Sequence, residues 1–454
     1  AGDRCRKCQT PIAGRFDAAP GRWGSRRQPV RIGDFAPPKP KTSLPIVERD
    51  KIAISLTEKT PMNVASPPTA AAGLSAAELS REHEQSILRT AGRVVAAAAR
   101  GAESHSAAAE LAPLAALHVA GAFVTLKRAG RLRSCCGMHG DRVPLAQAVV
   151  HAASRAANDD PRFPPISPTE LAHLEIEVSL LEQARPVAAQ GAAKRDAVVV
   201  GKHGLQISRG GSRGLLLPVV AVEHKLDAEE FLQHVCLKAG LPPTAWKEDD
   251  VTLSTFEGRA FGGRLAEVVE FGAEQHLSPV TAAEVSALAD FALGNLQATV
   301  AGATPSFYAF GMFDGNVSGL AAVLRHAAGA VWLQGSKVSL RQGLPLQATL
   351  FQIVEELAHS LLGAGIGAER LAGARLDLAV LYDPAMHGAL AAPDLRGFDP
   401  RRRALVILEA AKSSLAFAPE LAADDVLRRA TEQVSFSEPE AASVFSLAAV
   451  SNAA

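Results

Sequence analysis

The strongest fold signal in the sequence is Gly121-Ala-Phe-Val-Thr-Leu-Lys-Arg-Ala-Gly-Arg-Leu-Arg-Ser-Cys-Cys-Gly137. Residues 121–126 are rich in the β-branched and aromatic types that favour strands, and residues 131–133 begin a second strand. Between them, Lys127-Arg-Ala-Gly130 has the glycine of a tight turn. We therefore predict an antiparallel hairpin that leads directly into a pair of adjacent cysteines.

Helical and strand patterns alternate around this hairpin. Apolar residues at helical spacing, with capping residues before them, predict helices over residues 75–99, 144–157 and 227–240. The segment Leu174-Glu-Ile-Glu-Val-Ser-Leu180 alternates apolar and polar residues, which predicts a half-buried strand. Further strands, separated by glycine-rich turns, are predicted over residues 197–200, 205–208, 215–220 and 253–257.

The composition is that of a folded chain with more than one domain. Its 454 residues exceed the size at which a single core usually stops growing. Lys plus Arg and Asp plus Glu are equal at 47 each, so no general attraction to nucleic acid or to an anionic membrane is expected. No apolar stretch is long enough to span a bilayer, the Arg-rich start lacks the apolar core of a secretory signal, and the five cysteines are sparse. We expect a cytoplasmic protein.

The chain divides into four parts. Residues 1–40 have no periodicity and form a predicted tail, and residues 41–72 are rich in Pro, Ser, Thr and Lys, as in a semi-extended linker. A first domain over residues 73–265 is followed by residues 266–454, which repeat its patterns about 200 residues later. The echoes include Thr281-Ala-Ala-Glu284, Leu344-Pro-Leu-Gln-Ala348, Arg375-Leu-Asp-Leu-Ala-Val380, Arg403-Ala-Leu-Val-Ile407 and Ser443-Val-Phe-Ser446. We predict a duplication whose second copy is degenerate, because Gly335-Ser-Lys-Val-Ser-Leu-Arg341 stands opposite the cysteines without a thiol.

Several ordered motifs in residues 73–265 resemble the AMMECR family. The family hallmark Leu-Arg-Gly-Cys-Ile-Gly stands here as Leu132-Arg-Ser-Cys-Cys-Gly137, with departures at Ser134 and Cys136. Other matching segments are Asp160-Pro-Arg-Phe-Pro-Pro165, Leu174-Glu-Ile-Glu-Val-Ser179, Gly201-Lys-His-Gly-Leu205, Gly211-Ser-Arg-Gly-Leu-Leu-Leu-Pro218, Ala221-Val-Glu-His224 and Cys236-Leu-Lys-Ala-Gly-Leu-Pro242. The resemblance implies an α+β fold, in which helices flank an antiparallel sheet, and it implies no cofactor in either domain.

The tail resembles a different protein, the C-terminus of the radical SAM enzyme of the AmmeMemoRadiSam system. Cys5-Arg-Lys-Cys8, Ile12-Ala-Gly-Arg-Phe16 and Pro29-Val-Arg31 carry this likeness. No Cys-x3-Cys-x2-Cys motif is present, so we expect a fusion without the catalytic part, or a chain that begins inside a longer gene. The resemblance implies a radical SAM enzyme and a Memo-like protein as partners, with an unknown small-molecule substrate.

These resemblances leave three functions open. The first is an accessory or substrate-modifying component acting with those partners, the second is a non-catalytic binding or scaffold module, and the third is a cysteine-dependent hydrolase or transferase. Whether the domain is an enzyme therefore stays open.

Cys135 is the sharpest candidate for catalysis. Arg133 lies two residues before it, and a neighbouring cation together with free backbone amides would lower a thiol pKa and favour the thiolate. His139 and His203 are candidate bases, although a buried structural thiol is the commoner situation. Glu175, paired with Glu177 on one strand face, is a candidate acid or base, against the alternative of a solvated strand face.

Other residues are candidates for ligand or metal binding. Arg209 and Arg213 flank a glycine-rich turn that could bind an anion, or simply form a soluble hairpin turn. The remaining ligand-binding candidates are Cys136, Asp160, Arg162, Glu177, Glu223 and His224. Cys5 and Cys8 form half of a tetrahedral zinc site, so zinc binding there requires further ligands upstream.

Overall fold

The computed structural model describes residues 79–102, 107–271, 278–410 and 412–453. The predicted tail and linker, with Cys5, Cys8 and the capping box at Ser75, lie outside the described residues. The protein is α+β, with two large antiparallel sheets and helices packed on them. None of the described helices combines the length and the apolar character needed to cross a membrane.

In the first half, the sheet has the strand order β2-β1-β3-β7-β5-β6, and β4 pairs with β7. Its strands are β1 (His118–Arg128), β2 (Arg131–Pro144), β3 (Leu174–Leu181), β4 (Arg185–Pro186), β5 (His203–Arg209), β6 (Ser212–Leu216) and β7 (Thr252–Arg264). The α-helices are α2 (Arg81–Ala99), α3 (Leu145–Asn158), α4 (Pro218–Glu223), α5 (Ala228–Lys238) and α6 (Leu265–Val268). Short 3-10 helices are η2 (Ala107–Leu114), η3 (Pro168–His173), η4 (Gly191–Ala197) and η5 (Ala245–Lys247).

The predicted hairpin is confirmed and is longer than expected. Strands β1 and β2 pair in antiparallel register from His118↔Pro144 to Arg128↔Arg131, and the turn residues Ala129 and Gly130 have positive φ. The strand over residues 174–180 and the helices over 144–157 and 227–240 are also confirmed. Three expectations are corrected. The helix predicted from residue 75 begins at Arg81 after the N-cap Ser80, residues 197–200 form no strand, and residues 218–220 belong to α4.

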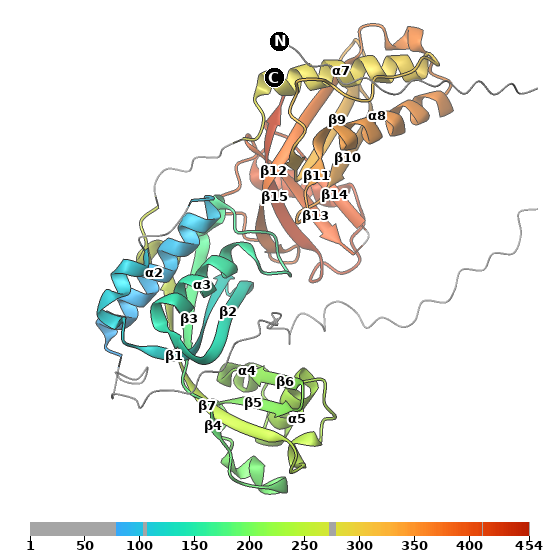
Figure 1. Cartoon of the computed structure of the whole chain (residues 1–454). Coiled ribbons are helices and arrows are strands. Elements are labelled where there is room, and N and C mark those ends of the chain that lie inside the picture. Colours follow the sequence, from blue (N-terminus) through green and yellow to red (C-terminus); the bar gives the residue numbers. More distant parts are fainter. Residues whose placement is uncertain (1–78, 103–106, 272–277, 411, 454) are drawn as a thin grey trace, which may run out of the picture. The chain divides into compact units, whose positions relative to one another are not determined.

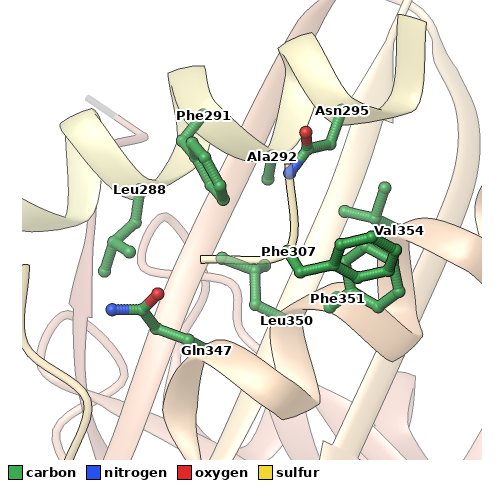
Figure 2. A pocket seen from close by; sticks show the side chains of 9 residues that line it. All are labelled: Leu288, Phe291, Ala292, Asn295, Phe307, Gln347, Leu350, Phe351 and Val354. Atoms are coloured by element: carbon green, nitrogen blue, oxygen red, sulfur yellow. The ribbon is translucent and has the colours of Figure 1, made fainter. Parts of the chain in front are cut away.

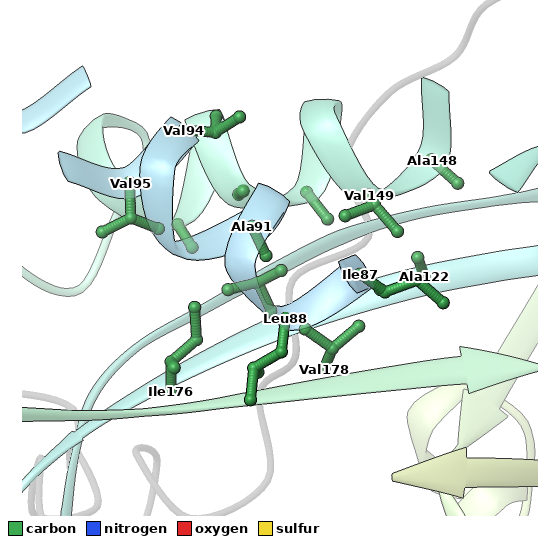
Figure 3. Packing of buried hydrophobic residues seen from close by; sticks show 14 of the residues in the cluster. Ile87, Leu88, Ala91, Val94, Val95, Ala122, Ala148, Val149, Ile176 and Val178 are labelled. Atoms are coloured by element: carbon green, nitrogen blue, oxygen red, sulfur yellow. The ribbon is translucent and has the colours of Figure 1, made fainter. Parts of the chain in front are cut away.

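Helices α2 and α3 pack on one face of the part of the sheet that contains β1, β2 and β3. Ile87, Leu88 and Val94 of α2 and Val149 of α3 pack against Val178 and its neighbours on β1 and β3 (Figure 3). Helix α5 covers β5 and β6 and forms a separate core that includes Phe231 and Trp246 (Figure 1). The opposite face of β1 and β3 is mixed. Its polar residues Thr125, Lys127, Glu175 and Glu177 are partly or fully exposed, whereas Phe123 and Leu181 are buried in a second cluster with Leu215, Leu217 and Phe256.

The second half contains a sheet of the same kind, with the strand order β10-β9-β12-β15-β13-β14. Its strands are β8 (Asn316–Val317), β9 (Gly319–Arg325), β10 (Val331–Val338), β11 (Leu344–Pro345), β12 (Arg375–Ala389), β13 (Arg403–Glu409), β14 (Lys412–Ala416) and β15 (Ser443–Ser451). Its helices are α7 (Ala282–Val300), α8 (Leu346–Gly363), η6 (Ala368–Leu371) and α9 (Ala423–Glu432). The echoed segment Thr281-Ala-Ala-Glu284 forms a capping box at the start of α7, since the Thr281 side chain accepts from Glu284 N and the Glu284 carboxylate accepts from Thr281 N.

Polar contacts join the two halves within the part of the chain that the structure describes. Arg128, at the end of β1, donates to Asp394 Oδ2 (3.0 Å) and to the carbonyl of Met386 (2.8 Å). From η3, Ser167 Oγ donates to Asp383 Oδ2 (2.8 Å). The second half therefore holds both β1 and η3, the two elements that flank the cysteine strand.

Candidate functional site

The register of the first sheet places four residues in one row across the face opposite α2 and α3. Thr125 of β1 lies opposite Cys135 of β2 on one side and opposite Glu177 of β3 on the other, and Glu177 in turn lies opposite Gly262 of β7. Residues directly opposite in antiparallel strands project from the same face. Hence residues far apart in the sequence meet in a single row.

The next row adds charged side chains on the same face. Lys127 lies opposite Glu175, which lies opposite Arg264. The residues of these rows on β1, β3 and β7, without Cys135 of β2, line a cavity of about 380 Å3, which we call the polar pocket. Its lining residues are Thr125, Lys127, Glu175, Ile176, Glu177, Gly262, Gly263 and Arg264.

Cys135, at the β2 end of the first row, is a neutral thiol. Its side chain is only 9% exposed, and Thr125 Oγ1 donates to its sulfur at 3.2 Å. Burial raises the pKa of the Cys135 thiol, although the Thr125 hydrogen bond and the positive charge of Arg162 act in the opposite direction. The expected lowering of the thiol pKa is therefore wrong.

Arg133 does not serve the thiol as the sequence suggested. It is the extra residue of a β-bulge, because Leu126 pairs with Ser134 while Lys127 pairs with Leu132. Its buried guanidinium binds Glu170 with two hydrogen bonds, Nε to Oε2 (2.7 Å) and NH2 to Oε1 (2.8 Å). Arg133 thus fixes η3 behind the cysteine strand.

Asp160 and Arg162 do gather at Cys135, as a second charged pair. Asp160 Oδ2 accepts from the Cys135 backbone N–H at 2.9 Å, and Arg162 donates to both carboxylate oxygens. Burial opposes ionisation of Asp160, but these hydrogen bonds hold its carboxyl pKa below the usual range. With Cys135 and Cys136 they line a smaller cavity of about 120 Å3.

Cys136 contributes to the core on the helix side of β2. Burial, reinforced by the charge of Asp160, raises the pKa of its thiol to about 12. A hydrophobic residue fits this role, which explains why isoleucine is the residue expected at this place in the AMMECR hallmark.

The remaining candidates do not line the polar pocket. His203 is on β5, four strands from β2 in the sheet order, where its Nδ1 accepts from Val199 N at 3.1 Å. Arg209 pairs with Glu248 and Asp250 on the surface. Of the other four, Arg213 is exposed on β6, His139 is exposed on β2, Glu223 ends α4, and His224 follows it as the helix cap.

Sequence reasoning missed Thr125, Lys127, Gly262 and Arg264. The period of two along residues 123–127 was a usable signal for the first two, because it places them on the face of Phe123. Gly262 and Arg264 were missed because β7 was expected to end at residue 257, seven residues before its observed end. No pattern in the local sequence indicates that β7 pairs with β3.

Among the described residues, neither a second cavity nor a metal-binding group offers another candidate site. A cavity between α7 and α8, lined by Phe291, Phe307 and Phe351 among others, measures about 10 Å3, which is the room of about one water molecule (Figure 2). Across the described ranges, no group of three or more His, Cys, Asp or Glu side chains could hold a metal ion.

Comparison with known proteins concerns the first half of the chain. Residues 88–261 match the AMMECR1 family profile. A protein of Methanothermobacter thermautotrophicus is 44% identical over 142 residues, which cover 31% of this chain and 74% of that protein. A protein of Thermococcus gammatolerans is 42% identical over 146 residues, with coverages of 31% and 71%.

A solved structure is also similar. The crystal structure of the uncharacterized protein PH0010 from Pyrococcus horikoshii is 34% identical and covers 39% of this chain and 91% of that chain, with a TM-score of 0.36.

Proposed function

The chain belongs to the AMMECR1 family, and from this premise we propose that its first half binds a small polar molecule in the polar pocket. In this proposal the protein is an accessory or substrate-modifying component, and the bound molecule is its substrate. The observation that carries the proposal is the row Cys135, Thr125, Glu177 and Gly262 beside a cavity of about 380 Å3. Small-molecule sites commonly have volumes of about 300–1,000 Å3 and a few convergent polar groups.

The neutral thiol favours this role over a cysteine-dependent hydrolase or transferase. A nucleophilic cysteine needs a lowered pKa or an adjacent base, whereas burial raises the pKa of the Cys135 thiol and its hydrogen-bond donor is Thr125. A non-catalytic scaffold is the alternative, and the experiment below separates it from ligand binding.

The proposed partners rest on the sequence alone. The resemblance of residues 1–40 to the end of a radical SAM enzyme supports action together with such an enzyme and with a Memo-like protein, in the cytoplasm. A tethered segment of this kind would raise the local concentration of one partner near the pocket.

We also propose that the second half is a degenerate copy of the first. The two strand orders correspond position by position. In each half, a basic residue on the second strand of the order forms an ion pair with a carboxylate on the third. Lys127 of β1 pairs with Glu177 of β3, and Arg325 of β9 pairs with Asp377 of β12. With these pairs aligned, the row equivalent to Cys135, Thr125 and Glu177 is Gln334, Val323 and Asp377. The thiol and the hydroxyl are both replaced.

Metabolite enrichment tests the binding function. The full chain is incubated with the small-molecule fraction of a microbial extract, re-isolated, and its bound compounds are identified by mass spectrometry. We expect a compound that is enriched by the wild type and by Glu257→Gln, a change on β7 outside the pocket, but not by Glu177→Gln. Equal enrichment by all three proteins, or no enrichment by any, would favour the scaffold alternative.

A further inference from the structure

We propose that the polar pocket selects a zwitterion, a small molecule with an ammonium group for Glu177 and a carboxylate for Lys127 and Arg264. This inference rests on the proposed binding function and adds the chemical class of the ligand. It is carried by the positions of the charges in the pocket and by the space beside Glu177.

The charged side chains of the pocket balance each other. Glu175 and Glu177 lie on the central strand β3, whereas the cations Lys127 and Arg264 lie on the flanking strands β1 and β7. A ligand of net positive charge would meet two cations, and one of net negative charge would meet two carboxylates. Only a ligand with both signs is matched by all four groups.

Glu177 is the carboxylate with room for a ligand cation. Its neighbour on β7 is Gly262, which has no side chain to cover it, and its neighbour on β1 is Thr125, whose hydroxyl can add a hydrogen bond. Glycine is also required at position 262 because β3 lies close to β7 there. A Cβ at this position would lie 2.4 Å from the Ile176 carbonyl oxygen. The opening beside Glu177 is therefore part of the sheet geometry.

The ion pair already present in the pocket is loose enough to open. Lys127 Nζ lies 3.6 Å from Glu177 Oε2, and the two side chains are 33% and 36% exposed. Partly exposed ion pairs of this kind contribute little to stability. A ligand ammonium can take the place of Lys127 at Glu177, and the freed ammonium of Lys127 can then bind the ligand carboxylate.

The second half supplies an internal comparison. Asp377, which is equivalent to Glu177, is only 8% exposed and is held by Arg325 (2.5 Å) and Arg375 (2.9 Å). Burial and the two nearby arginines make this carboxylate less accessible than Glu177 to a ligand ammonium. The inference therefore includes a stoichiometry of one zwitterion per chain.

Charge-matched probes test this ligand class. Ligand-observed NMR on the full chain measures the dissociation constant of each probe. Three probes are zwitterions that differ in the separation of their charges: L-alanine, β-alanine and 4-aminobutyrate. Two probes retain one charge each: L-alanine methyl ester and N-acetyl-L-alanine. We expect at least one zwitterion to bind at one site, at least about tenfold more tightly than either singly charged probe. Glu177→Gln should remove that preference, while Glu257→Gln should keep it; an unchanged thermal unfolding temperature shows that each variant is folded.

Three results would overturn the inference: no binding of any zwitterion, equal affinity for the singly charged probes, or a preference that survives Glu177→Gln. The binding function itself is judged separately. If the extract yields a Glu177-dependent compound that is not a zwitterion, the pocket remains a binding site and only the ligand class is wrong.

Discussion

The environment of Cys135 combines burial with several charges, and burial dominates. Thr125 and Arg162 stabilise the thiolate, but loss of water around the sulfur raises the thiol pKa. The sequence shows a cation, Arg133, two residues before the thiol. No sequence rule indicates that Arg133 occupies a β-bulge and donates hydrogen bonds to Glu170. The spacing of residues therefore identified the segment around Cys135 correctly, but the predicted effect of Arg133 on the thiol pKa was wrong.

The reactivity of Cys135 follows from this raised pKa. With iodoacetamide at pH 7, we expect Cys135 to react at least about tenfold more slowly than a model thiol, because only the thiolate attacks and the site is buried. Peptide mapping by mass spectrometry gives the rate for each cysteine, and the rate at Cys135 should still be rising at pH 9. A rate that levels off below pH 8 would instead identify an activated nucleophile.

Arg133 should be important for stability. In Arg133→Met, Glu170 is left buried without its bidentate partner, and breaking a buried pair in this way costs about 3–5 kcal/mol in the free energy of unfolding. Urea titration measures the loss. Arg209→Met, which removes a surface pair, should cost at most about 1 kcal/mol. Similar losses in the two variants would contradict the role assigned to Arg133.

At the scale of elements, the long strand β7 builds the pocket. Its segment 252–257 pairs with β5 and its segment 258–264 pairs with β3, so it joins the part of the sheet under α2 and α3 to the part under α5. The alternation of residues 174–180 predicted β3 from the sequence, because each step alternates between core and solvent. The second segment of β7 has the sequence Gly258-Arg-Ala-Phe-Gly-Gly-Arg264, where three glycines obscure the strand pattern, and only the pairing with β3 makes it a strand.

The register of the β1–β2 hairpin leaves no room for a side chain at the end of the cysteine segment. A Cβ on Gly137 would lie 2.4 Å from the Ala122 carbonyl oxygen and from the ring of Phe123. Gly137→Ala should therefore lower the free energy of unfolding by about 1–3 kcal/mol, as overpacking does. Thermal and urea unfolding give the value, with Gly211→Ala as the control, because a Cβ at Gly211 meets no atom within 4 Å. If the control is equally destabilised, the close approach is not the cause.

At the scale of the whole molecule, the two halves share a strand order, but the thiol and the hydroxyl of the Cys135 row are replaced in the second half. The sequence echoes predicted a repeated pattern, because strand alternation and helix caps survive substitution of the polar site residues. The contacts that join the halves could not be predicted, since Arg128, Met386 and Asp394 belong to segments without any shared motif. These contacts include a buried histidine, His387, whose Nδ1 lies 3.3 Å from the Arg128 guanidinium.

His387 should make the stability of the chain sensitive to acid. Burial, followed by the charge of Arg128, lowers the pKa of His387 to about 3, whereas an unfolded histidine titrates near pH 6.5. Because the unfolded chain gains a proton first, stability is complete above about pH 6.5 and falls by about 1.4 kcal/mol for each pH unit below it, until the folded pKa is reached. Urea unfolding at pH 7 and pH 5 should show this fall, and His387→Gln should reduce it by about 2 kcal/mol. An undiminished fall in the variant would exclude His387 as its source.

The central claim, that the polar pocket is the ligand site, is tested most directly by hydrogen–deuterium exchange of the full chain with and without the enriched compound. We predict that protection concentrates on peptides from the three strands that line the pocket, β1, β3 and the second segment of β7. Glu177→Gln should abolish that protection, whereas Glu257→Gln should retain it. Protection centred instead on β5, β6 and α4, where His203, Arg213 and Glu223 lie, or protection that persists in Glu177→Gln, would contradict the claim.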